Sequence, residues 1–233
     1  MVRYWLDDDF EFPSPEEADE TGLLVIGGRL QPDRLIQAYS SGIFPWPHDG
    51  LPMLWFSPDP RMVLMPGNLR VPRSLRSVLR QGRFEIRLDG DFRRVIEGCA
   101  TASRKHDDDR TWITPEVQDA YTTVHEMGYA HCVEAWFDGD LVGGAYGISV
   151  GGAFVGESMF ARETDASKAA FATLVRQLSR WGIDLVDGQV PTGHLARLGF
   201  APVPRTDYLS ALREAVEKPT RLGPWRLDDD IVW

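Results

Sequence analysis

The sequence contains little cysteine and no long hydrophobic run, and each scarcity excludes a class of protein. Its two cysteines, Cys99 and Cys132, form no Cys-x-x-Cys pair, which suits a reducing cytosol and predicts two buried thiols. No apolar stretch approaches the roughly 20 residues that a membrane-spanning helix needs. The acidic first 20 residues lack the apolar centre of a signal peptide. Internal repeats are also absent. From the cysteines, the lack of a long apolar run and the acidic N-terminal residues, we expect a soluble, cytoplasmic protein that does not use a membrane.

Positive charge is scarce as well, because the 233 residues carry 25 lysines and arginines against 35 acidic residues, a formal net charge of −10. Such a balance argues against nucleic-acid binding, but the distribution of charge matters more than its sum. Arginines gather between residues 70 and 94, where Arg73, Arg76 and Arg80 fall on one face of an expected helix. Two interpretations stay open: a solvated helix face, or a patch that contacts phosphates.

The N-terminal quarter of the chain is rich in proline, glycine and aromatic residues. Within it, Pro32 near a helix start and Gly42 after the helix predict one short helix. The following stretch, FPWPHDGLPMLWFSPDPR, holds too much proline for a central strand and predicts an ordered, aromatic-lined loop. We place a domain boundary near residues 58–64, which predicts a small domain over residues 1–62 and a second domain over residues 63–233.

The second domain has a regular order of expected elements, with Thr114 as a helix N-cap and glycine turns at Gly139 and Gly151. In chain order the elements are strand and helix (84–100), helix (114–128), three antiparallel strands (131–160), helix (from 164 or 165 to 182), strand (183–190), short helix (193–199) and a strand from residue 200. This order resembles the acyltransferase fold of the GNAT superfamily. The expected class is α+β, with a mixed, largely antiparallel sheet flanked by helices.

An acetyl-CoA-dependent enzyme of that superfamily is the first functional alternative. Such enzymes hold pyrophosphate on backbone amides of a glycine-containing turn before the helix that follows the three strands. Here the turn reads FARETDASKAA, without a glycine pair, and Glu163 and Asp165 would repel phosphate. A metal site at HDDD, residues 106–109, is disfavoured because consecutive residues do not converge on one ion. Neither cysteine has an evident activating base.

Asp187 and Gln189 interrupt the expected buried strand over residues 183–190. Strand residues two apart point to the same face, with Cα atoms roughly 6.5–7 Å apart, so these side chains share a side while Val186 and Val190 take the other. A carboxylate and an amide directed at one place cost free energy unless something pairs with them. Either they satisfy each other and nearby backbone, or they hold a substrate.

Glu157 is a second polar group in an expected strand, AFVGESMF. Alternation divides that strand into two faces, with Phe154, Gly156 and Ser158 on one and Val155, Glu157 and Met159 on the other. A carboxylate is unusual in a core. The pattern predicts an exposed face, an ion pair with Arg162, or a partner for a cationic or amino group beside an apolar pocket.

Aromatic residues surround the proline-rich segment; they are Tyr39, Trp46, Trp55 and Phe56, with Trp112 at the entry of a later helix. Most rings in a globular protein belong to a core, but rings also stack on unpaired bases. Beside a positive patch, they make a single-stranded RNA end a plausible ligand.

A series of segments carries a family resemblance and runs in order from about residue 13 to residue 209. They are GLLVIGGRL, AYSSGIFPW, WFSPDPR, TWIT, AYTTVHEMGYAH, LVGGAYG, FVGESMF, ASKAAF, DGQV and PRTDYL. Together they make the chain similar to the bacterial leucyl/phenylalanyl-tRNA–protein transferase family. The resemblance implies an enzyme that moves Leu, Phe and less often Met from aminoacyl-tRNA to proteins with an N-terminal Lys or Arg, marking them for N-degron degradation. It also implies a GNAT-like C-terminal domain and neither metal nor coenzyme A.

The resemblance assigns roles by motif. Asp187 and Gln189 are the implied catalytic pair, in which Asp187 would hold the Gln189 amide while the amide carbonyl orients the attacking amine. The implied substrate-binding residues are Tyr39, Trp46 and Trp112 around the aminoacyl-adenosine end, and Phe154, Gly156, Glu157 and Met159 around the transferred side chain and the acceptor. With tRNA as the substrate, the helix face of Arg73, Arg76 and Arg80 is the expected tRNA contact.

Three features depart from the family pattern, and none touches the catalytic pair. Arg29 stands where the family usually has Asp, and the loop over residues 191–193 differs in detail. Ala145 stands where a larger aliphatic residue is common, which would widen the pocket and blur the preference among Leu, Phe and Met. We expect a monomer. A non-catalytic aminoacyl-tRNA-binding protein and an acetyl-CoA-dependent acetyltransferase stay open as alternatives.

Overall fold

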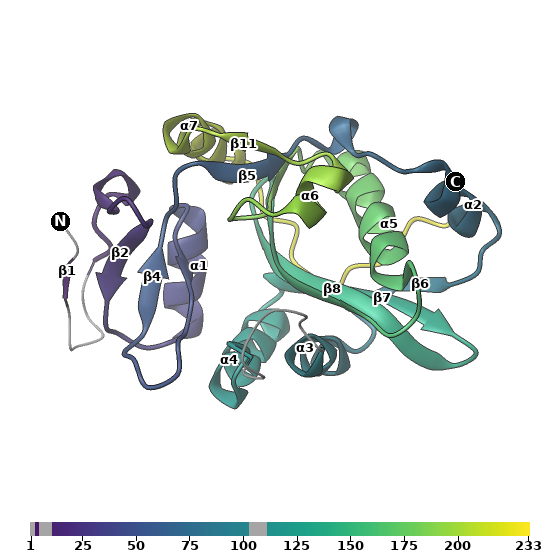
Figure 1. Cartoon of the computed structure of the whole chain (residues 1–233), viewed down its shortest axis with the longest axis horizontal. Helices are drawn as coiled ribbons and strands as arrows, with labels where there is room; N and C mark the ends of the chain where they lie inside the picture. The colour runs from purple at the N-terminus through teal and green to yellow at the C-terminus, as the bar shows by residue number, and fades with distance from the viewer. Residues whose placement is uncertain (1–2, 5–10, 103–110) are drawn as a thin grey trace.

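The computed structural model describes residues 3–4, 11–102 and 111–233 of the chain. Residues 106–109, where the sequence disfavoured a metal site, therefore lie outside the described residues. At the N-terminal side is a four-stranded sheet in the order β1 (Arg3–Tyr4), β2 (Leu23–Ile26), β4 (Leu54–Phe56) and β3 (Phe44–Pro45). The short 3-10 helix η1 (Pro15–Glu17) precedes β2, and helix α1 (Pro32–Ser40) lies beside the sheet (Figure 1).

The proline-rich segment is more regular than the loop that the sequence predicted, because β3 and β4 pair within it as antiparallel strands. Two features allow this pairing. Pro45 lies on β3, which is the edge strand of the sheet, where a missing N–H group is tolerated. Strand β4 itself contains no proline. The expectation that this segment forms an ordered loop and not strands was therefore wrong for β3 and β4.

A seven-stranded sheet forms the larger part of the molecule. Its strands, in spatial order, are β11 (Ala201–Val203), β5 (Arg61–Leu64), β10 (Leu185–Asp187), β9 (Ala153–Ala161), β8 (Asp140–Val150), β7 (Ala130–Phe137) and β6 (Glu85–Leu88). Among these described strands, only β9 and β10 run parallel, and every other neighbouring pair is antiparallel. The prediction of a mixed, largely antiparallel sheet is confirmed.

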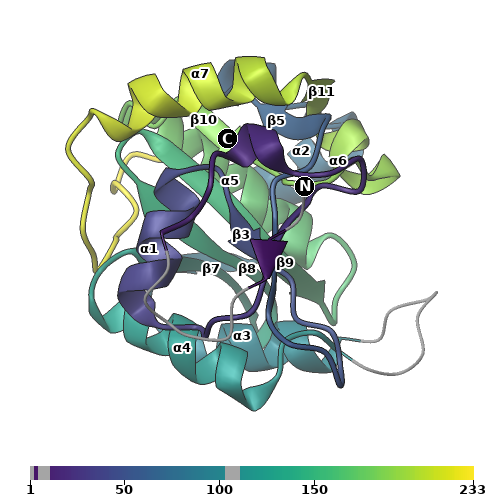
Figure 2. The same ribbon diagram turned by 90° about the vertical axis from the view of Figure 1, so that its left-hand side faces the viewer.

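Helices cover both faces of this sheet. Figure 1 shows α3 (Phe92–Thr101) and α4 (Pro115–Glu126) on one face and α5 (Ala166–Arg180) on the other, with α2 (Arg73–Arg80) beside α5. The short α6 (Gly193–Leu198) follows β10, and the 3-10 helix η2 (Pro66–Asn68) follows β5. Figure 2 shows α7 (Arg205–Val216) at the end of the molecule opposite α3 and α4. No helix in the described ranges has the length and apolarity needed to span a membrane.

Local sequence signals explain most of these boundaries. The Thr114 side chain accepts a hydrogen bond from the backbone N–H of Val117 and so caps α4 as expected. Asp165 occupies the N-cap position of α5, but its carboxylate binds Lys168 instead of capping the helix. Gly151 turns the chain between β8 and β9 with a φ of +55°, and a Cβ there would lie 2.3 Å from the Ala215 carbonyl oxygen. That turn therefore requires glycine.

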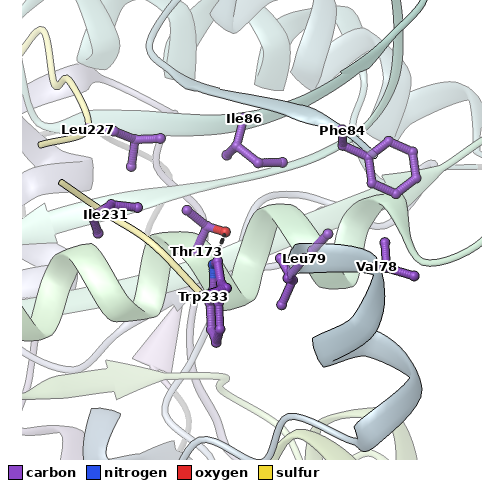
Figure 3. Close-up of a pocket in the computed structure, with 9 residues that line it drawn as sticks. Val78, Leu79, Phe84, Ile86, Thr173, Leu227, Ile231 and Trp233 are labelled. Carbon is purple, nitrogen blue, oxygen red and sulfur yellow. Dashed lines mark hydrogen bonds between the residues drawn. The ribbon is translucent and has the colours of Figure 1, made fainter. Parts of the chain in front are cut away.

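The segment after α7 crosses the molecule without forming another helix or strand. Trp225 is buried and stacks on His131, with ring centroids 3.5 Å apart. Farther along, Trp233 Nε1 donates to Thr173 Oγ1 on α5 at 3.2 Å. Between this segment, α2, α5 and β6 lies a small apolar cavity of ≈ 210 Å³ (Figure 3). The segment thus binds α5 at this side of the sheet.

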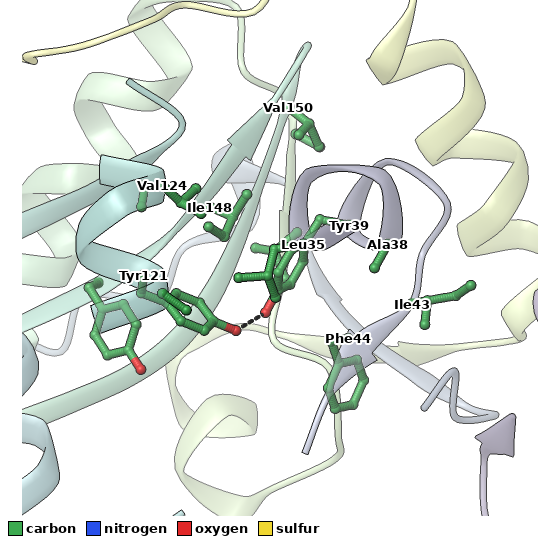
Figure 4. Close-up of a cluster of buried hydrophobic side chains, with 14 of the residues drawn as sticks. Leu35, Ala38, Tyr39, Ile43, Phe44, Tyr121, Val124, Ile148 and Val150 are labelled. Atoms are coloured by element: carbon green, nitrogen blue, oxygen red, sulfur yellow. Dashed lines mark hydrogen bonds between the residues drawn. The ribbon is translucent and has the colours of Figure 1, made fainter. Parts of the chain in front are cut away.

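The buried core has two parts, one on each face of the large sheet. On the α5 side it contains Phe154, Phe171 and Leu174. On the opposite side, side chains from α1, α4 and β8 pack together, including Leu35 and Ile148 (Figure 4). This second cluster continues into the small sheet, so the same apolar contacts join the N-terminal segment to the large sheet. The site described next lies at that junction.

Candidate active site

A cavity of ≈ 700 Å³ opens where strands β9 and β10 separate. Residues 153–155 pair with residues 185–187, and β9 then continues to Ala161 beyond the end of β10. The apolar lining includes Ala145, Phe154, Met159, Phe171, Val186 and Phe200. The polar lining includes Glu157, Ser158, Asp187, Gln189, Thr192 and His194. An apolar wall beside a few converging polar groups suits a ligand that joins an apolar side chain to a polar reacting centre.

Asp187, the last residue of β10, carries a buried bidentate ion pair with Arg61. The side chains of both residues are 1% exposed. Arg61 Nε lies 2.9 Å from Asp187 Oδ1, and Arg61 Nη2 lies 2.6 Å from Oδ2. The Tyr208 hydroxyl on α7 also donates to Oδ2, at 2.8 Å. These partners hold the buried carboxylate in one place, and removing Arg61 would take away its positive partner.

Gln189 does not lie on the same strand face as Asp187, so that prediction was wrong. Strand β10 ends at Asp187, and Gln189 has a φ of +62°, in the left-handed region. The backbone explains the change: Gly188 N–H donates to the Met62 carbonyl, and Met62 N–H donates to the Gln189 carbonyl. The Asp187 carboxylate instead accepts the backbone N–H of Gln189, at 2.7 Å. Asp187 therefore positions Gln189 through its backbone.

Gly188 lets Leu195 on helix α6 and Phe200, just before β11, pack closely against the turn over residues 187–189. A Cβ at this position would lie 2.7 Å from Leu195 Cδ1 and 2.9 Å from Phe200 Cε1. Real Cβ atoms do not tolerate such distances, so with any larger residue either the turn or the Leu195 and Phe200 side chains would have to shift. The glycine thus contributes to where Gln189 stands.

The side-chain amide of Gln189 is oriented by Glu157 on β9. Gln189 Nε2 donates to Glu157 Oε1 at 2.7 Å. A carboxylate oxygen accepts hydrogen bonds from the amide nitrogen, so this contact fixes which end of the amide faces Glu157. Within the described ranges, no donor bonds to the side-chain carbonyl oxygen of Gln189, Oε1. That oxygen is therefore available, at the cavity, to a group that donates a hydrogen bond.

Two tyrosines hold Glu157 from behind. The Tyr39 hydroxyl donates to Oε1 at 2.7 Å and the Tyr121 hydroxyl to Oε2 at 3.2 Å. The two hydroxyls also contact each other (Figure 4). Burial raises the pKa of Glu157 to about 7, although the tyrosine hydrogen bonds act in the opposite direction. Glu157 can therefore gain or lose a proton near neutral pH.

A β-bulge places Glu157 in this position. Tyr146 pairs with Ser158 but Gly147 pairs with Gly156, so Glu157 is an extra residue on β9. The alternation of faces reverses at that point. Phe154 and Met159 consequently pack with the same buried cluster, and the predicted division of this strand into two faces was wrong.

One of the alternatives left open for Glu157, an ion pair with Arg162, is not formed. Arg162 Nη1 donates to the Leu141 carbonyl instead, at 3.2 Å. Glu157 is turned the other way, toward Tyr39, Tyr121 and Gln189. It also lines the cavity. The remaining interpretation of the sequence, a partner for a polar or amino group beside an apolar pocket, agrees with this placement.

The aromatic residues divide into cavity and core. Trp46 and Trp112 line the cavity. Tyr39 does not line it but stands behind Glu157, 1% exposed. Trp55 is fully buried and donates from Nε1 to the Gly27 carbonyl, so it belongs to the core. Phe56 packs against the Trp46 ring, with centroids 5.7 Å apart, and supports it.

The arginine-rich segment is less uniform than its composition suggests. Four of its arginines have acidic partners: Arg83 with Glu163, Arg87 with Glu85, Arg93 with Asp119 and Arg94 with Asp91. Arg73, Arg76 and Arg80 are exposed on α2. In the described part of the chain, none of these three has an acidic partner. They form the segment's unneutralised positive face, which we call the α2 arginine face.

Sequence reasoning missed three residues of this site. Arg61 and Tyr208 lie in the segments WFSPDPR and PRTDYL, but no local pattern showed that both would meet Asp187. His194 on α6 lines the cavity, and burial together with the positive charges of Arg197 and Lys168 lowers its pKa. In the described ranges, no group of three or more His, Cys, Asp or Glu residues is placed to hold a metal ion.

Comparisons of sequence with known proteins cover most of the chain. A family profile described as "Leucyl/phenylalanyl-tRNA protein transferase N-terminal domain" matches residues 28–59, and one described as "Leucyl/phenylalanyl-tRNA protein transferase" matches residues 63–213. A leucyl/phenylalanyl-tRNA–protein transferase of Myxococcus xanthus (strain DK1622) is 52% identical over 97% of each chain. One from Nitrosospira multiformis is 50% identical over 98% of each chain. Among solved structures, a GCN5-related N-acetyltransferase from Kribbella flavida is 15% identical, with a TM-score of 0.34 over 70% of this chain and 58% of that one.

Proposed function

Because the chain belongs to the leucyl/phenylalanyl-tRNA protein transferase family, we propose that it transfers Leu or Phe from aminoacyl-tRNA to the α-amino group of a protein. We further propose that Met is transferred less often and that the acceptors begin with Lys or Arg. The modified proteins would then enter N-degron degradation in the cytoplasm. The enzyme would act as a monomer.

One observation carries this proposal: two carboxylates fix Gln189, one through its backbone and one through its side chain, at the polar end of an otherwise apolar cavity. Glu157 holds its side-chain nitrogen and Asp187 holds its backbone nitrogen. The apolar wall, which includes Phe154 and Met159, suits the side chain of Leu or Phe. The Trp46 and Trp112 rings suit the terminal adenosine, because rings stack on unpaired bases.

The reaction needs positioning more than activation, because the aminoacyl ester is already reactive. The acceptor's α-amine, with an ordinary pKa of about 8, must be neutral to attack the ester carbonyl. Gln189 is not a base, but its carbonyl oxygen can accept a hydrogen bond from the amine and direct the nitrogen lone pair. The new C–N bond forms as the ester C–O bond breaks, and the amine proton ends on the departing ribose oxygen. Holding the two reactants in this geometry supplies much of the acceleration.

Glu157 has three roles in this scheme. It keeps the Gln189 carbonyl facing the cavity, and its negative charge favours the approach of a cationic acceptor. Since its pKa is raised to about 7 by burial, it can also take up the proton from the amine and pass it to the departing ribose oxygen. The hydrogen bonds from Tyr39 and Tyr121 stabilise its ionised form.

The α2 arginine face is the proposed tRNA contact. Arg73, Arg76 and Arg80 present positive charge on a protein whose net charge is −10. Contacts of this kind bind the phosphate backbone without reading sequence. A concentrated face on an acidic protein would favour tRNA at this one surface over other nucleic acid contacts.

We also propose that residues 1–62 and 63–233 act as two domains with the cavity at their junction. The N-terminal part supplies Phe44, Pro45 and Trp46 to the lining, and the rest of the lining comes from the second part. The small sheet, which lies within residues 1–62, and the two family profiles support this division, while strand β5 (Arg61–Leu64) crosses the boundary. The shared core cluster would hold the two parts in one arrangement.

The deciding experiment offers radiolabelled Leu-, Phe- and Met-tRNA to the protein with acceptors that begin with Arg, Lys or Ala. We expect label on the Arg and Lys acceptors and none on the Ala acceptor. Gln189→Ala should lower transfer at least about 100-fold while tRNA binding persists. Gln37→Ala, which changes an exposed glutamine on α1, is the matched control. Binding of aminoacyl-tRNA without transfer by the wild-type protein would indicate a non-catalytic binding protein instead.

A further inference from the structure

Arg61 is buried next to the site without lining the cavity. We propose that Arg61 is a positioning residue for the transfer reaction. Its side chain connects the base of the cavity to the N-terminal wall of the cavity. This inference rests on the proposed function. Arg61 is the first residue of β5, and its guanidinium group meets three distant parts of the chain: the end of β10, the turn after α1 and helix α7.

The first connection runs through Asp187 to Gln189. Asp187 Oδ1 receives both Arg61 Nε, at 2.9 Å, and the backbone N–H of Gln189, at 2.7 Å. Gln189 needs such support because its φ of +62° is unfavourable for a residue with a side chain. Without the guanidinium group, the buried carboxylate would lose its counter-charge and the turn would lose a fixed anchor.

The second connection runs to the wall of the cavity. Arg61 Nη1 donates to the Gly42 carbonyl at 3.1 Å, just before β3 begins. The guanidinium carbon also lies 4.9 Å from the centre of the Phe44 ring. Phe44 lines the cavity, as does Trp46 two residues later. One side chain therefore fixes both the residue that orients the amine and the wall that faces it.

Only arginine can make both connections at once. Its planar group carries five N–H donors in a fixed fork, whereas lysine offers a single ammonium group on a flexible stem. Lysine at position 61 could neutralise Asp187 but would not bind the carboxylate in two places and reach Gly42 together. Arg61→Lys therefore keeps the charge and removes the geometry, whereas Arg61→Met removes both.

Arg205→Met is the matched control. Arg205, on α7, also ties distant chain segments together, with Nη1 donating to the Ser57 carbonyl at 2.6 Å and Nη2 to the Glu16 carbonyl at 3.3 Å. It makes no contact with Asp187 among the described residues. A loss of activity caused only by losing arginine bonds to backbone carbonyls would appear in both variants, whereas a change in the position of Gln189 would appear only at position 61.

The test measures kcat and KM for Leu-tRNA on protein that circular dichroism shows to be folded. We expect Arg61→Lys to lower kcat at least about tenfold and Arg61→Met at least about 100-fold, with KM for tRNA changed less than about threefold. Arg205→Met should stay within about threefold of the wild type in both constants. A kcat within twofold of the wild type for Arg61→Lys, or losses equal to those of Arg205→Met, would overturn the proposal. If neither Arg61 variant folds, Arg61 is a structural residue only, and the proposal is wrong.

A second readout follows the residue being positioned. Protein labelled with ¹⁵N-glutamine reports the backbone amide of Gln189, whose signal is assigned by its loss in Gln189→Ala. We expect this signal to move in Arg61→Lys and to stay in place in Arg205→Met; an unmoved signal in Arg61→Lys contradicts the proposal. This readout needs no substrate. If the wild-type protein transfers no amino acid, the proposed function fails while the positioning of Gln189 by Arg61 is still tested.

Discussion

Gln189 donates a hydrogen bond from Nε2 to Glu157 Oε1 at 2.7 Å, so a carboxylate on β9 orients the amide that follows β10. The sequence had suggested that Asp187, two residues away, would orient this amide. Asp187 instead holds the backbone N–H of Gln189. The two carboxylates thus have different roles: Asp187 fixes the backbone position of Gln189, and Glu157 fixes the direction of the Gln189 side chain.

The activity of Glu157→Gln should depend on pH differently from that of the wild type. As pH rises through about 7, Glu157 loses its proton and becomes a better acceptor for the Gln189 amide and for the acceptor's amine. The wild-type rate should therefore rise through this range, and rise further near pH 8 as the acceptor amine becomes neutral. The rate of the Glu157→Gln variant should show only the rise near pH 8. The ratio of the two rates, measured from about pH 5.5 to about pH 8.5, should grow roughly tenfold with pH. A ratio that does not change with pH would contradict the role given to Glu157.

The same substitution should stabilise the fold at high pH. The folded-state pKa of Glu157, about 7, lies above its ordinary value of 4.5 because of burial. The folded protein therefore binds this proton more tightly than the unfolded chain, and stability is lost as pH rises from about 4.5 to about 7. Glu157→Gln escapes this loss. Its free energy of unfolding, relative to wild type, should improve by about 1–3 kcal/mol between pH 5 and pH 8.

Urea unfolding at the two pH values measures this change in the free energy of unfolding. Glu97→Gln, an exposed glutamate on α3, is the control and should show no such trend. An equal difference between wild type and Glu157→Gln at both pH values would show that Glu157 is not held in its protonated form by folding.

The α2 arginine face should determine the salt dependence of tRNA binding. Replacing Arg73, Arg76 and Arg80 together by Gln should weaken binding and reduce the slope of log K against log salt by roughly 2 to 3. Arg93→Gln serves as the control, because Arg93 is an exposed arginine already paired with Asp119. Filter binding at several salt concentrations gives the slopes. An unchanged slope in the triple variant would show that this face is merely solvated.

Ala145 should affect which amino acid is transferred. It lines the cavity and pairs with Met159 across β8 and β9. Ala145→Leu should reduce the space beside the apolar wall of the cavity. It should therefore reduce Phe transfer more than Leu transfer and raise the Leu-to-Phe ratio of kcat/KM roughly tenfold. Ala161→Leu, at an exposed position near the end of β9, is the control. A ratio that stays constant in Ala145→Leu would show that the transferred side chain does not reach this wall.

Local patterns predicted much of the fold. Proline and glycine positions predicted α1, and Thr114 predicted the start of α4. The turns at Gly139 and Gly151 predicted the three antiparallel strands. These features depend on backbone preferences and side-chain periodicity over a few residues, so they can be read without knowing the rest of the chain. The proline-rich segment was the exception, because whether β3 and β4 form depends on pairing with β2.

The candidate site was predicted in part. Asp187, Gln189, Glu157, Trp46 and Trp112 do line one cavity. Their mutual contacts were not predicted. The expected side-chain directions of Glu157 and of Asp187 and Gln189 both assumed uninterrupted strands. A strand that ends at Asp187 and a bulge at Glu157 change where side chains point, and neither event has a local signal in the sequence.

The sequence by itself determined the class of protein, the order of elements and the residues with chemical potential, because periodicity, capping and turn preferences are local. Only the tertiary structure decided which of those residues act on one another. Arg61 and Asp187 are separated by 126 positions and Tyr39 and Glu157 by 118. The first pair forms when β5 and β10 pair in the large sheet, and the second when α1 packs against that sheet. The physical reason is that a buried charge is stabilised by whatever partner the fold brings near it, and distance along the chain does not specify that partner.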